Sequence, residues 1–209
     1  MYIIINKGEG NTVHMMSERR TDMNPILKDI PLSFETERLT LRAPLPQGDG
    51  RVVNEAINRS LNELKPWLGF AQVAPTVEET EINLREAYVR FRKREAFRYL
   101  IFHKETGELI GSTGFHNVDW EVPKGEIGYW VDTRYGGAGY ITEAVKGLTE
   151  LALSHIGFRR VEIRCESMNV KSRAIPEKLG YELEGILRNE SPSVDGTKLT
   201  DTCIYSIVR

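Results

Sequence analysis

The sequence of 209 residues has little cysteine, no long apolar segment and no excess of basic residues. Its two cysteines, Cys165 and Cys203, lie in apolar contexts typical of strands, which favours two buried thiols over a disulfide. No apolar run approaches the roughly 18 residues of a membrane span. The opening MYIIINKGEG lacks the basic segment and the cleavage site of a signal peptide. We therefore expect a soluble, cytoplasmic protein with no membrane partner.

The charges of the sequence are nearly balanced, with 28 Lys and Arg against 30 Asp and Glu and a net charge of −2. Proteins that bind nucleic acids typically carry a basic excess or a basic stripe, so we expect no nucleic acid partner. The His, Cys, Asp and Glu residues do not cluster at the spacing of metal ligands, so we expect no metal.

The patterning of the sequence changes near residue 33. Residues 1–33 contain Gly, Asn, Arg and Pro without a sustained period, which predicts a loosely ordered N-terminal extension. Residues 34–209 show no linker and no internal repeat, and they are predicted to form one domain.

Within the predicted domain, helices are mixed with runs of consecutive strands. Apolar runs and period-two patterns predict strands at residues 39–42, 97–103, 109–115, 126–131, 161–165, 181–187 and 202–208. Helical spacing predicts helices at residues 52–64, 77–94 and 140–156, and a short one between Asn169 and Gly180. Thr76 and Glu79 form a capping-box pattern, and Gly157 suits a helix C-terminus. Consecutive strands with one crossover helix predict an α/β fold, a mixed sheet with helices on both faces.

A glycine-rich stretch, Arg134-Tyr-Gly-Gly-Ala-Gly139, connects the predicted strand 126–131 to the helix that begins near Tyr140. Such a turn directs several backbone N–H groups and the positive end of the helix dipole at one spot, which suits a phosphate or pyrophosphate. Glycine is favoured there because a side chain would block the approach of the anion to the backbone.

Two common phosphate motifs fit this stretch poorly. The Lys-Ser/Thr pair that closes a P-loop is missing. Gly137 and Gly139 match part of the dinucleotide fingerprint, but Thr142 replaces the third glycine. Glu162 lies inside its strand rather than at the strand's end. A nucleotide-dependent oxidoreductase is therefore a weaker interpretation.

Two motifs resemble those of one enzyme family. Arg134-x-x-Gly137-x-Gly139 is similar to the (Gln/Arg)-x-x-Gly-x-(Gly/Ala) signature of the GNAT superfamily of N-acetyltransferases. Asn169-Val-Lys-Ser172 and the following Lys-Leu-Gly180-Tyr181 resemble a second block of that family. Together with Glu35-Thr-Glu-Arg-Leu39, the pattern resembles the RimJ/RimL-like branch, which acetylates N-terminal amines of ribosomal proteins.

The resemblance implies the GNAT fold, with a mostly antiparallel twisted sheet, and acetyl-CoA as cosubstrate. It also implies that strands 126–131 and 161–165 splay apart around the pantetheine arm, with a backbone N–H near Trp130 or Val131 facing the thioester. It assigns cofactor contacts to the following residues: Trp130, Val131, Arg134, Gly136, Gly137, Ala138, Gly139, Tyr140 and Asn169. A homodimer is compatible with the resemblance.

Ser172 is the candidate proton donor to the departing thiolate. Many GNAT enzymes use a tyrosine in this helix, and the matching position here is Pro176, which has no proton to give. Because Pro176 lacks an N–H, it cannot bond the Ser172 carbonyl, so we expect the helix to bend there and to orient the Ser172 hydroxyl.

Glu126, acting through water, is the first candidate for the base, and Glu184, Glu190 and His116 are alternatives. Segment ends and the resemblance to related proteins suggest an acceptor channel framed by Trp67, Phe115, His116 and Asn117.

The lack of an obvious strong base favours an α-amine as the acceptor, and the resemblance to the RimJ/RimL-like branch implies the N-terminus of a ribosomal protein. Neutralising a lysine amine costs about 3.5 kcal/mol more than neutralising an α-amine, because their ordinary pKa values are about 10.4 and about 7.8. A site without an obvious strong base therefore fits an α-amine better. The alternatives are a small amine, such as an aminoglycoside, polyamine or amino acid, and a non-catalytic module that only binds coenzyme A.

Overall fold

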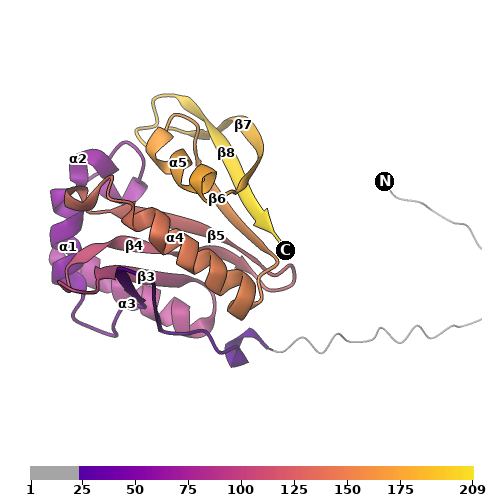
Figure 1. Cartoon of the computed structure of the whole chain (residues 1–209). Helices are drawn as coiled ribbons and strands as arrows, with labels where there is room; N and C mark the ends of the chain where they lie inside the picture. Colours follow the sequence, from indigo (N-terminus) through magenta and orange to yellow (C-terminus); the bar gives the residue numbers. More distant parts are fainter. Residues whose placement is uncertain (1–23) are drawn as a thin grey trace, which may run out of the picture.

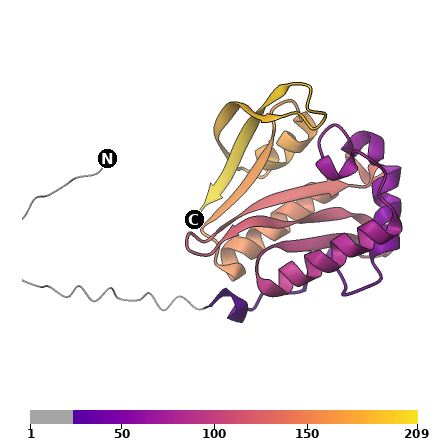
Figure 2. The same ribbon diagram turned by 180° about the vertical axis from the view of Figure 1, so that it is seen from behind.

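The computed structural model describes residues 24–209, and predictions that concern residues 1–23 lie outside the described residues. The chain forms one sheet of eight strands in the order β1-β2-β3-β4-β5-β6-β8-β7. Figure 1 and, from behind, Figure 2 show helices on both faces of this sheet. The predicted α/β class with a mixed sheet is confirmed.

The strands are β1 (Ser33–Glu35), β2 (Leu39–Arg42), β3 (Phe97–His103), β4 (Leu109–Asp119), β5 (Lys124–Val131), β6 (Arg160–Glu166), β7 (Glu182–Pro192) and β8 (Leu199–Val208). The α-helices are α1 (Gly50–Arg59), α2 (Leu61–Leu64), α3 (Val77–Lys93), α4 (Tyr140–Leu151) and α5 (Val170–Lys178). Short 3-10 helices lie at Pro25–Leu27, Gly69–Ala71 and Thr133–Tyr135.

All neighbouring strands pair antiparallel except β5 and β6, which are parallel and joined by the crossover helix α4. Helices α1 and α3 cover one face of the sheet, and α4 and α5 cover the other (Figures 1 and 2). The larger apolar core lies on the α4 side, and a smaller cluster that includes Val53, Ile57, Leu84 and Leu100 lies under α1 and α3.

The predicted helix ends are confirmed in two places. The Thr76 hydroxyl accepts the Glu79 N–H while the Glu79 carboxylate accepts the Thr76 N–H, so α3 begins with a capping box. After α4 the chain makes one π-helical turn, Ala152–Ile156, and stops at Gly157, whose φ of 88° is left-handed.

The predicted helix over residues 52–64 divides at Ser60 into α1 and α2. The Ser60 side chain is fully buried, and its hydroxyl accepts the Thr133 N–H at 2.8 Å. Ser60 therefore makes a long-range hydrogen bond at the position where the predicted helix divides. The helical spacing of apolar residues carries no information about such a bond.

Residues 24–33, which the sequence assigned to a loosely ordered extension, are held against the domain. Ile30 is buried in the core, and the Tyr99 hydroxyl donates to the Pro31 carbonyl at 2.7 Å. The Arg94 guanidinium donates to the Lys28 carbonyl at 2.8 Å. The structured domain therefore extends upstream of the predicted boundary.

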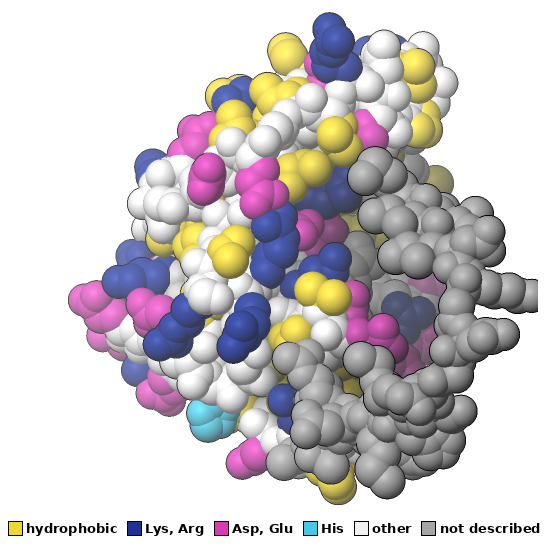
Figure 3. All heavy atoms as spheres, turned by 90° about the vertical axis from the view of Figure 1, so that its right-hand side faces the viewer, with side chains coloured by type: hydrophobic (Ala, Val, Ile, Leu, Met, Phe, Trp, Pro, Cys, Tyr) yellow, Lys and Arg dark blue, Asp and Glu magenta, His cyan; other side chains and the backbone are white. Residues whose placement is uncertain are grey.

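The surface carries both signs of charge. Figure 3 shows Lys and Arg side chains interspersed with Asp and Glu on the face to the right of Figure 1. None of the helices in residues 24–209 has the length and apolar character that crossing a bilayer requires. The same residues contain no group of three or more His, Cys, Asp and Glu side chains placed to hold a metal ion.

Candidate active site

The glycine-rich stretch forms a turn that opens directly into α4. Gly137 and Gly139 have left-handed φ values of 79° and 80°, and Gly139 is the N-cap of the helix. Within residues 24–209, the backbone N–H groups of residues 137–142 have no protein acceptor. Since no atom of the described residues lies within 4 Å of the position of a Gly137 Cβ, this row of donors is accessible to an anion from their side.

The start of α4 is fixed by the turn between β1 and β2. The Glu143 carboxylate accepts hydrogen bonds from the Thr36 hydroxyl at 2.6 Å and from the Arg38 N–H and Nε at 2.8 and 2.6 Å. Burial raises the pKa of Glu143, but these donors and the Arg38 charge outweigh burial and lower it. The Arg38 guanidinium lies 4.4 Å from the centre of the Tyr140 ring. Sequence reasoning assigned no role to Arg38 or to Glu143.

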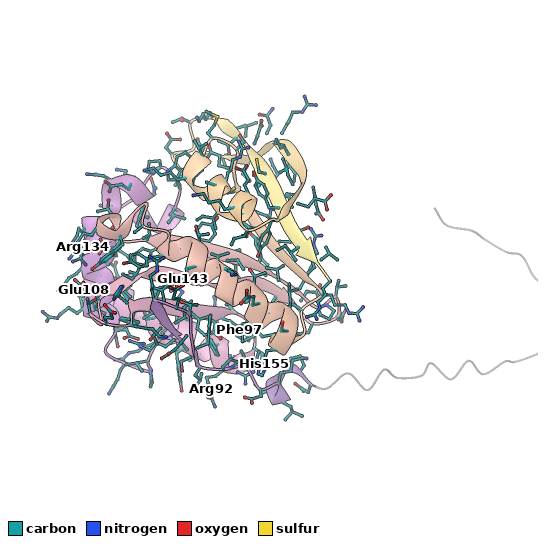
Figure 4. The ribbon with its side chains drawn as sticks, in the orientation of Figure 1. Arg92, Phe97, Glu108, Arg134, Glu143 and His155 are labelled. Carbon is teal, nitrogen blue, oxygen red and sulfur yellow. The ribbon has the colours of Figure 1, made fainter. Side chains whose placement is uncertain are left out.

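Arg134, whose side chain is 44% exposed, pairs with a buried carboxylate at the base of the turn. Its Nη2 lies 3.0 Å from the carboxylate of Asp132, which is fully buried, and Arg59 reaches the same carboxylate at 2.6 Å. Figure 4 shows Arg134 beside Glu108, at 3.7 Å. The structure therefore places the Arg134 guanidinium in contact with acids, and the anion-accessible groups of the turn are backbone amides.

Strands β5 and β6 separate after a short paired segment. Their register ends at Glu126 opposite Glu162, although β5 continues to Val131 and β6 to Glu166. The Asp132 N–H donates to the Ile110 carbonyl of β4. Because antiparallel ladders alternate, Trp130 directs its backbone N–H toward β4, and Tyr129 and Val131 direct theirs toward the open side. Of the two amides predicted to face the thioester, Val131 has the required direction.

Ser172 lies on α5, across the opening from Tyr129 of β5. The Asn169 side chain caps α5 by accepting the Ser172 N–H at 3.1 Å. The Ser172 and Tyr129 hydroxyls are 3.1 Å apart, and the Tyr129 hydroxyl also donates to the Ser172 carbonyl at 3.0 Å. The helix continues through Pro176 to Lys178.

Both polar neighbours of the Ser172 hydroxyl are protonated groups. Burial raises the pKa of Tyr129 far above its usual range. Burial also raises the pKa of the Cys165 thiol to about 11, and the nearby Ser172 hydroxyl lowers it only in part. The phenol 3.1 Å from the Ser172 hydroxyl and the nearby Cys165 thiol are therefore both neutral near pH 7. Tyr129 was missed because it belongs to a strand, far from Ser172 in the sequence.

Glu126, the candidate base, lies beside His116 and Asn117, two residues assigned to the acceptor channel. His116 and Glu126 are directly opposite in the β4–β5 register. The Asn117 amide donates to the Glu126 carboxylate at 3.0 Å, and His116 Nε2 lies 3.8 Å from the other carboxylate oxygen. Asn117 adopts a left-handed φ of 49°.

The two other candidate carboxylates, Glu184 and Glu190, are each paired with an arginine. Arg160 forms a two-pronged pair with Glu184 and lowers the pKa of Glu184 to about 2. Hydrogen bonds from Ser191 and Thr202, together with Arg164, lower the pKa of Glu190. Carboxylates with such low proton affinity are poor bases, which favours Glu126 among the carboxylates considered.

A cavity of about 620 Å³ lies between the sheet and the helices α1 and α3. It is lined by α3 residues from Glu79 to Arg90, by β4 residues from Ser112 to His116 and by Gly128, Tyr129 and Trp130 of β5. The cavity therefore extends to the strand that borders the opening toward Ser172.

The predicted acceptor residues differ in their relation to this cavity, since Phe115 and His116 are among its lining residues and Asn117 is not. Phe115 is buried, and its ring packs edge-on against Phe158 at 5.2 Å, so its side chain belongs to the core. Trp67 is outside the cavity lining, whereas Leu68 and Phe70 of the same segment contribute to it.

A shallow second pocket lies beside the first turn of α4 and contains Gly139 with three cations, Arg38, Lys146 and Lys178, and two acids, Glu37 and Glu143, of which Glu143 is paired with Arg38. Positive charge next to unpaired helix N–H groups favours an anion. These three cations are in separate segments of the sequence, so no local motif could have indicated them.

Comparisons with known proteins agree with this geometry. A model of the acetyltransferase (GNAT) domain family matches residues 38–182. The putative ribosomal N-acetyltransferase YdaF of Bacillus subtilis is 35% identical over 157 residues, covering 73% of this chain and 82% of that protein. The ribosomal-protein-serine acetyltransferase of Escherichia coli is 26% identical over 153 residues, covering 73% and 84%. The solved structure of RimL, a ribosomal-protein α-N-acetyltransferase in complex with coenzyme A, has a TM-score of 0.75 at 24% identity and covers 86% of this chain and 97% of that chain.

The chain therefore belongs to the GNAT acetyltransferase family, and it is an acetyl-CoA-dependent N-acetyltransferase. The predicted superfamily, enzyme class and cosubstrate are confirmed. The residues present suit acetyl-CoA, because accessible amides at the α4 N-terminus match a pyrophosphate and the opening between β5 and β6 adjoins a hydroxyl at Ser172.

Proposed function

We propose that the enzyme acetylates the N-terminal α-amine of a protein, and that the amine attacks the thioester directly through a tetrahedral intermediate. One observation carries this proposal. The unpaired edge of β5 adjoins the Ser172 hydroxyl, and the acceptor cavity extends to the same strand. The names of YdaF and of the Escherichia coli relative suggest a ribosomal protein as the substrate class.

The cosubstrate is held by the turn and the strand edge in this proposal. The N–H groups of residues 137–142 bind the pyrophosphate, and Arg38, Lys146 and Lys178 add positive charge beside it. The Val131 N–H donates to the thioester oxygen, where negative charge develops during the attack. A positioned donor of this kind contributes about 3 kcal/mol to transition-state stabilisation.

Ser172 acts on the sulfur. As the C–N bond forms and the C–S bond breaks, the Ser172 hydroxyl gives its proton to the departing thiolate and takes one back from water, so that the products are the amide and the thiol of coenzyme A. Tyr129 positions this serine, because its hydroxyl donates to the Ser172 carbonyl at 3.0 Å and lies 3.1 Å from Ser172 Oγ.

Glu126 receives the proton of the amine through a water molecule. His116 extends from the same row of the sheet into the cavity, 3.8 Å from Glu126, and it positions that water. Because an α-amine is already partly neutral near pH 7.8, a carboxylate of this kind is a sufficient base for it, but not for a lysine at about 10.4.

The test uses peptides that differ in the kind of amine. One peptide has a free α-amine and no lysine, and its partner has a blocked N-terminus and one lysine. A panel of small amines is run in parallel, and acetylation is located by mass spectrometry. Acetylation of the α-amine alone supports the proposal. Acetylation only of lysine or of small amines contradicts it, and acetyl-CoA binding without turnover on any of them would indicate a binding module.

A further inference from the structure

The floor of the acceptor cavity contains a row of three residues, Arg98 of β3, Gly114 of β4 and Gly128 of β5, that are directly opposite one another in the sheet register. Strands are about 4.8 Å apart, so the row extends about 10 Å from Arg98 to the strand beside the opening. All three residues line the cavity.

The two glycines keep this part of the floor bare. A Cβ at Gly114 would lie 2.1 Å from the Phe97 carbonyl oxygen, and one at Gly128 would lie 3.2 Å from His116 Nε2. The adjoining rows carry larger groups, His116 with Glu126 on one side and Ser112 with Trp130 on the other. The bare row therefore forms a lane across the sheet that ends at the Arg98 side chain.

Arg98 carries a charge without a counter-ion. No ion pair among residues 24–209 includes it, and its one side-chain hydrogen bond is donated by Nη1 to the Asn83 amide oxygen at 2.6 Å. Burial lowers the pKa of Arg98, and the charge of Arg90 lowers it further. Partly buried guanidinium groups without a carboxylate are costly, and a planar anion is the partner that relieves the cost.

Two acids also line the cavity, Glu79 and Glu86. The Glu79 carboxylate is used in the capping box with Thr76, and Glu86 makes no ion pair with Arg90 or Arg98 within the described chain. Glu86 and Arg90 are both exposed on α3, at the outer side of the cavity, while Arg98 lies on its floor.

We propose that the acceptor carries a carboxylate at the second or third residue from its reacting amine, and that this carboxylate pairs with the Arg98 guanidinium at the end of the bare lane. The inference rests on the proposed acetylation of an N-terminal amine and names its substrate class, an N-terminus with an early acidic residue. An extended peptide advances about 3.3–3.6 Å per residue, so two to three residues span the lane.

The experiment uses alanine–glycine hexapeptides with a free N-terminus and an amidated C-terminus. A single Asp is placed at position 2, 3 or 4, and each peptide has an Asn and a Lys counterpart. We expect kcat/KM to be about tenfold to hundredfold higher for Asp than for Asn at position 2 or 3, because a charge-assisted hydrogen bond contributes that much. An Asp/Asn ratio near one at every position, or a preference for Lys, overturns the inference while leaving α-amine acetylation standing.

Variants of Arg98 test whether the preference for Asp over Asn depends on this side chain. Arg98→Gln is expected to bring the Asp/Asn ratio to about one while acetylation of the Asn peptide and binding of coenzyme A change little. Arg98→Met, which keeps the length of the side chain, serves if the first variant does not fold. Arg85→Gln is the matched control, since Arg85 is exposed on α3 and pairs with Glu81 outside the cavity, and its ratio should equal that of the parent. An unchanged ratio in both Arg98 variants overturns the inference.

Equilibrium binding makes the inference testable even if no peptide is acetylated, an outcome that would refute the proposed function. Calorimetry with the enzyme loaded with coenzyme A should then show tighter binding of the best Asp peptide than of its Asn counterpart. The difference should disappear in Arg98→Gln. Equal affinities in the parent enzyme overturn the inference by this route as well.

Discussion

The hydroxyl of Tyr129 donates a hydrogen bond to the backbone carbonyl of Ser172, at 3.0 Å. Four residues further along α5 the chain has Pro176, which has no N–H with which to satisfy that carbonyl. A strand residue thus supplies the hydrogen bond that the helix cannot make. The same hydroxyl lies 3.1 Å from Ser172 Oγ. Tyr129 is therefore the partner both of the carbonyl that Pro176 leaves without a hydrogen bond and of the candidate proton donor.

Tyr129→Phe should lower the free energy of unfolding by about 1–3 kcal/mol, since it leaves the Ser172 carbonyl and hydroxyl without this partner. Pro176→Ala restores an N–H that can reach the carbonyl. We therefore expect Pro176→Ala to recover more stability in the Tyr129→Phe background than in the parent. Denaturant unfolding of the four proteins measures this coupling, and additive changes would show that the two residues are independent.

Ser172→Ala should lower kcat by about 10²-fold, the typical contribution of a positioned proton donor. The KM for acetyl-CoA should change little, because the backbone N–H groups of the turn remain. Steady-state kinetics at saturating acceptor make the measurement, with Ser193→Ala in the exposed turn between β7 and β8 as the control. Turnover equal to that of the parent would remove Ser172 from the mechanism.

Sequence patterns predicted the features of this protein that depend only on residues close to one another in the sequence. The capping box at Thr76 and Glu79, the stop at Gly157 and the glycine turn before α4 are all formed by neighbours in sequence, and each is present. The separation of β5 and β6 followed only from the family resemblance, because no periodicity indicates where a strand pair stops pairing.

The residues that sequence reasoning missed act across long separations. Tyr129 meets Ser172 across 43 positions, Arg59 meets Asp132 across 73, and Arg38 meets Glu143 across 105. A single sequence contains no local signal for such pairs. The break at Ser60 has the same origin, because the residue serves Thr133 of the turn rather than its own helix.

Gly137→Ala should raise the KM for acetyl-CoA about tenfold, since the methyl group would occupy open space beside the amides of the turn. Left-handed backbone also makes alanine cost about 1 kcal/mol of stability. Gly196→Ala is the matched control, because Gly196 has a φ of 70° and equally open surroundings in a distant turn. Both variants should lose similar stability, and only the first should change KM. A KM for acetyl-CoA that is the same in Gly137→Ala as in the parent would mean that the pyrophosphate binds elsewhere.

Glu126→Gln should lower kcat/KM by about 10²-fold near pH 7, where the α-amine is mostly protonated and must lose a proton. The deficit should narrow above about pH 9, because the amine is then neutral without help. His116→Ala should cause a smaller loss. A pH profile of both variants on one α-amine peptide decides the assignment, and a larger loss for His116→Ala would identify the histidine as the base.

Asp132→Asn should destabilise the fold at neutral pH and leave it relatively less affected in acid. Burial raises the pKa of Asp132, but the hydrogen bonds and charges of Arg134 and Arg59 outweigh burial and lower it. A depressed pKa contributes stability that is fully present above the unfolded value, about 3.9, and is lost as the pH falls through the folded value below it. We expect the variant to lose about 2 kcal/mol at pH 7, because two guanidinium groups lose their buried partner. Urea unfolding between pH 7 and pH 3 measures the difference in the free energy of unfolding between variant and parent. This difference should be constant down to about pH 5 and should shrink below about pH 4. A gap that widens in acid would mean that Asp132 is protonated in the folded protein and that the two arginines stabilise the turn by another route.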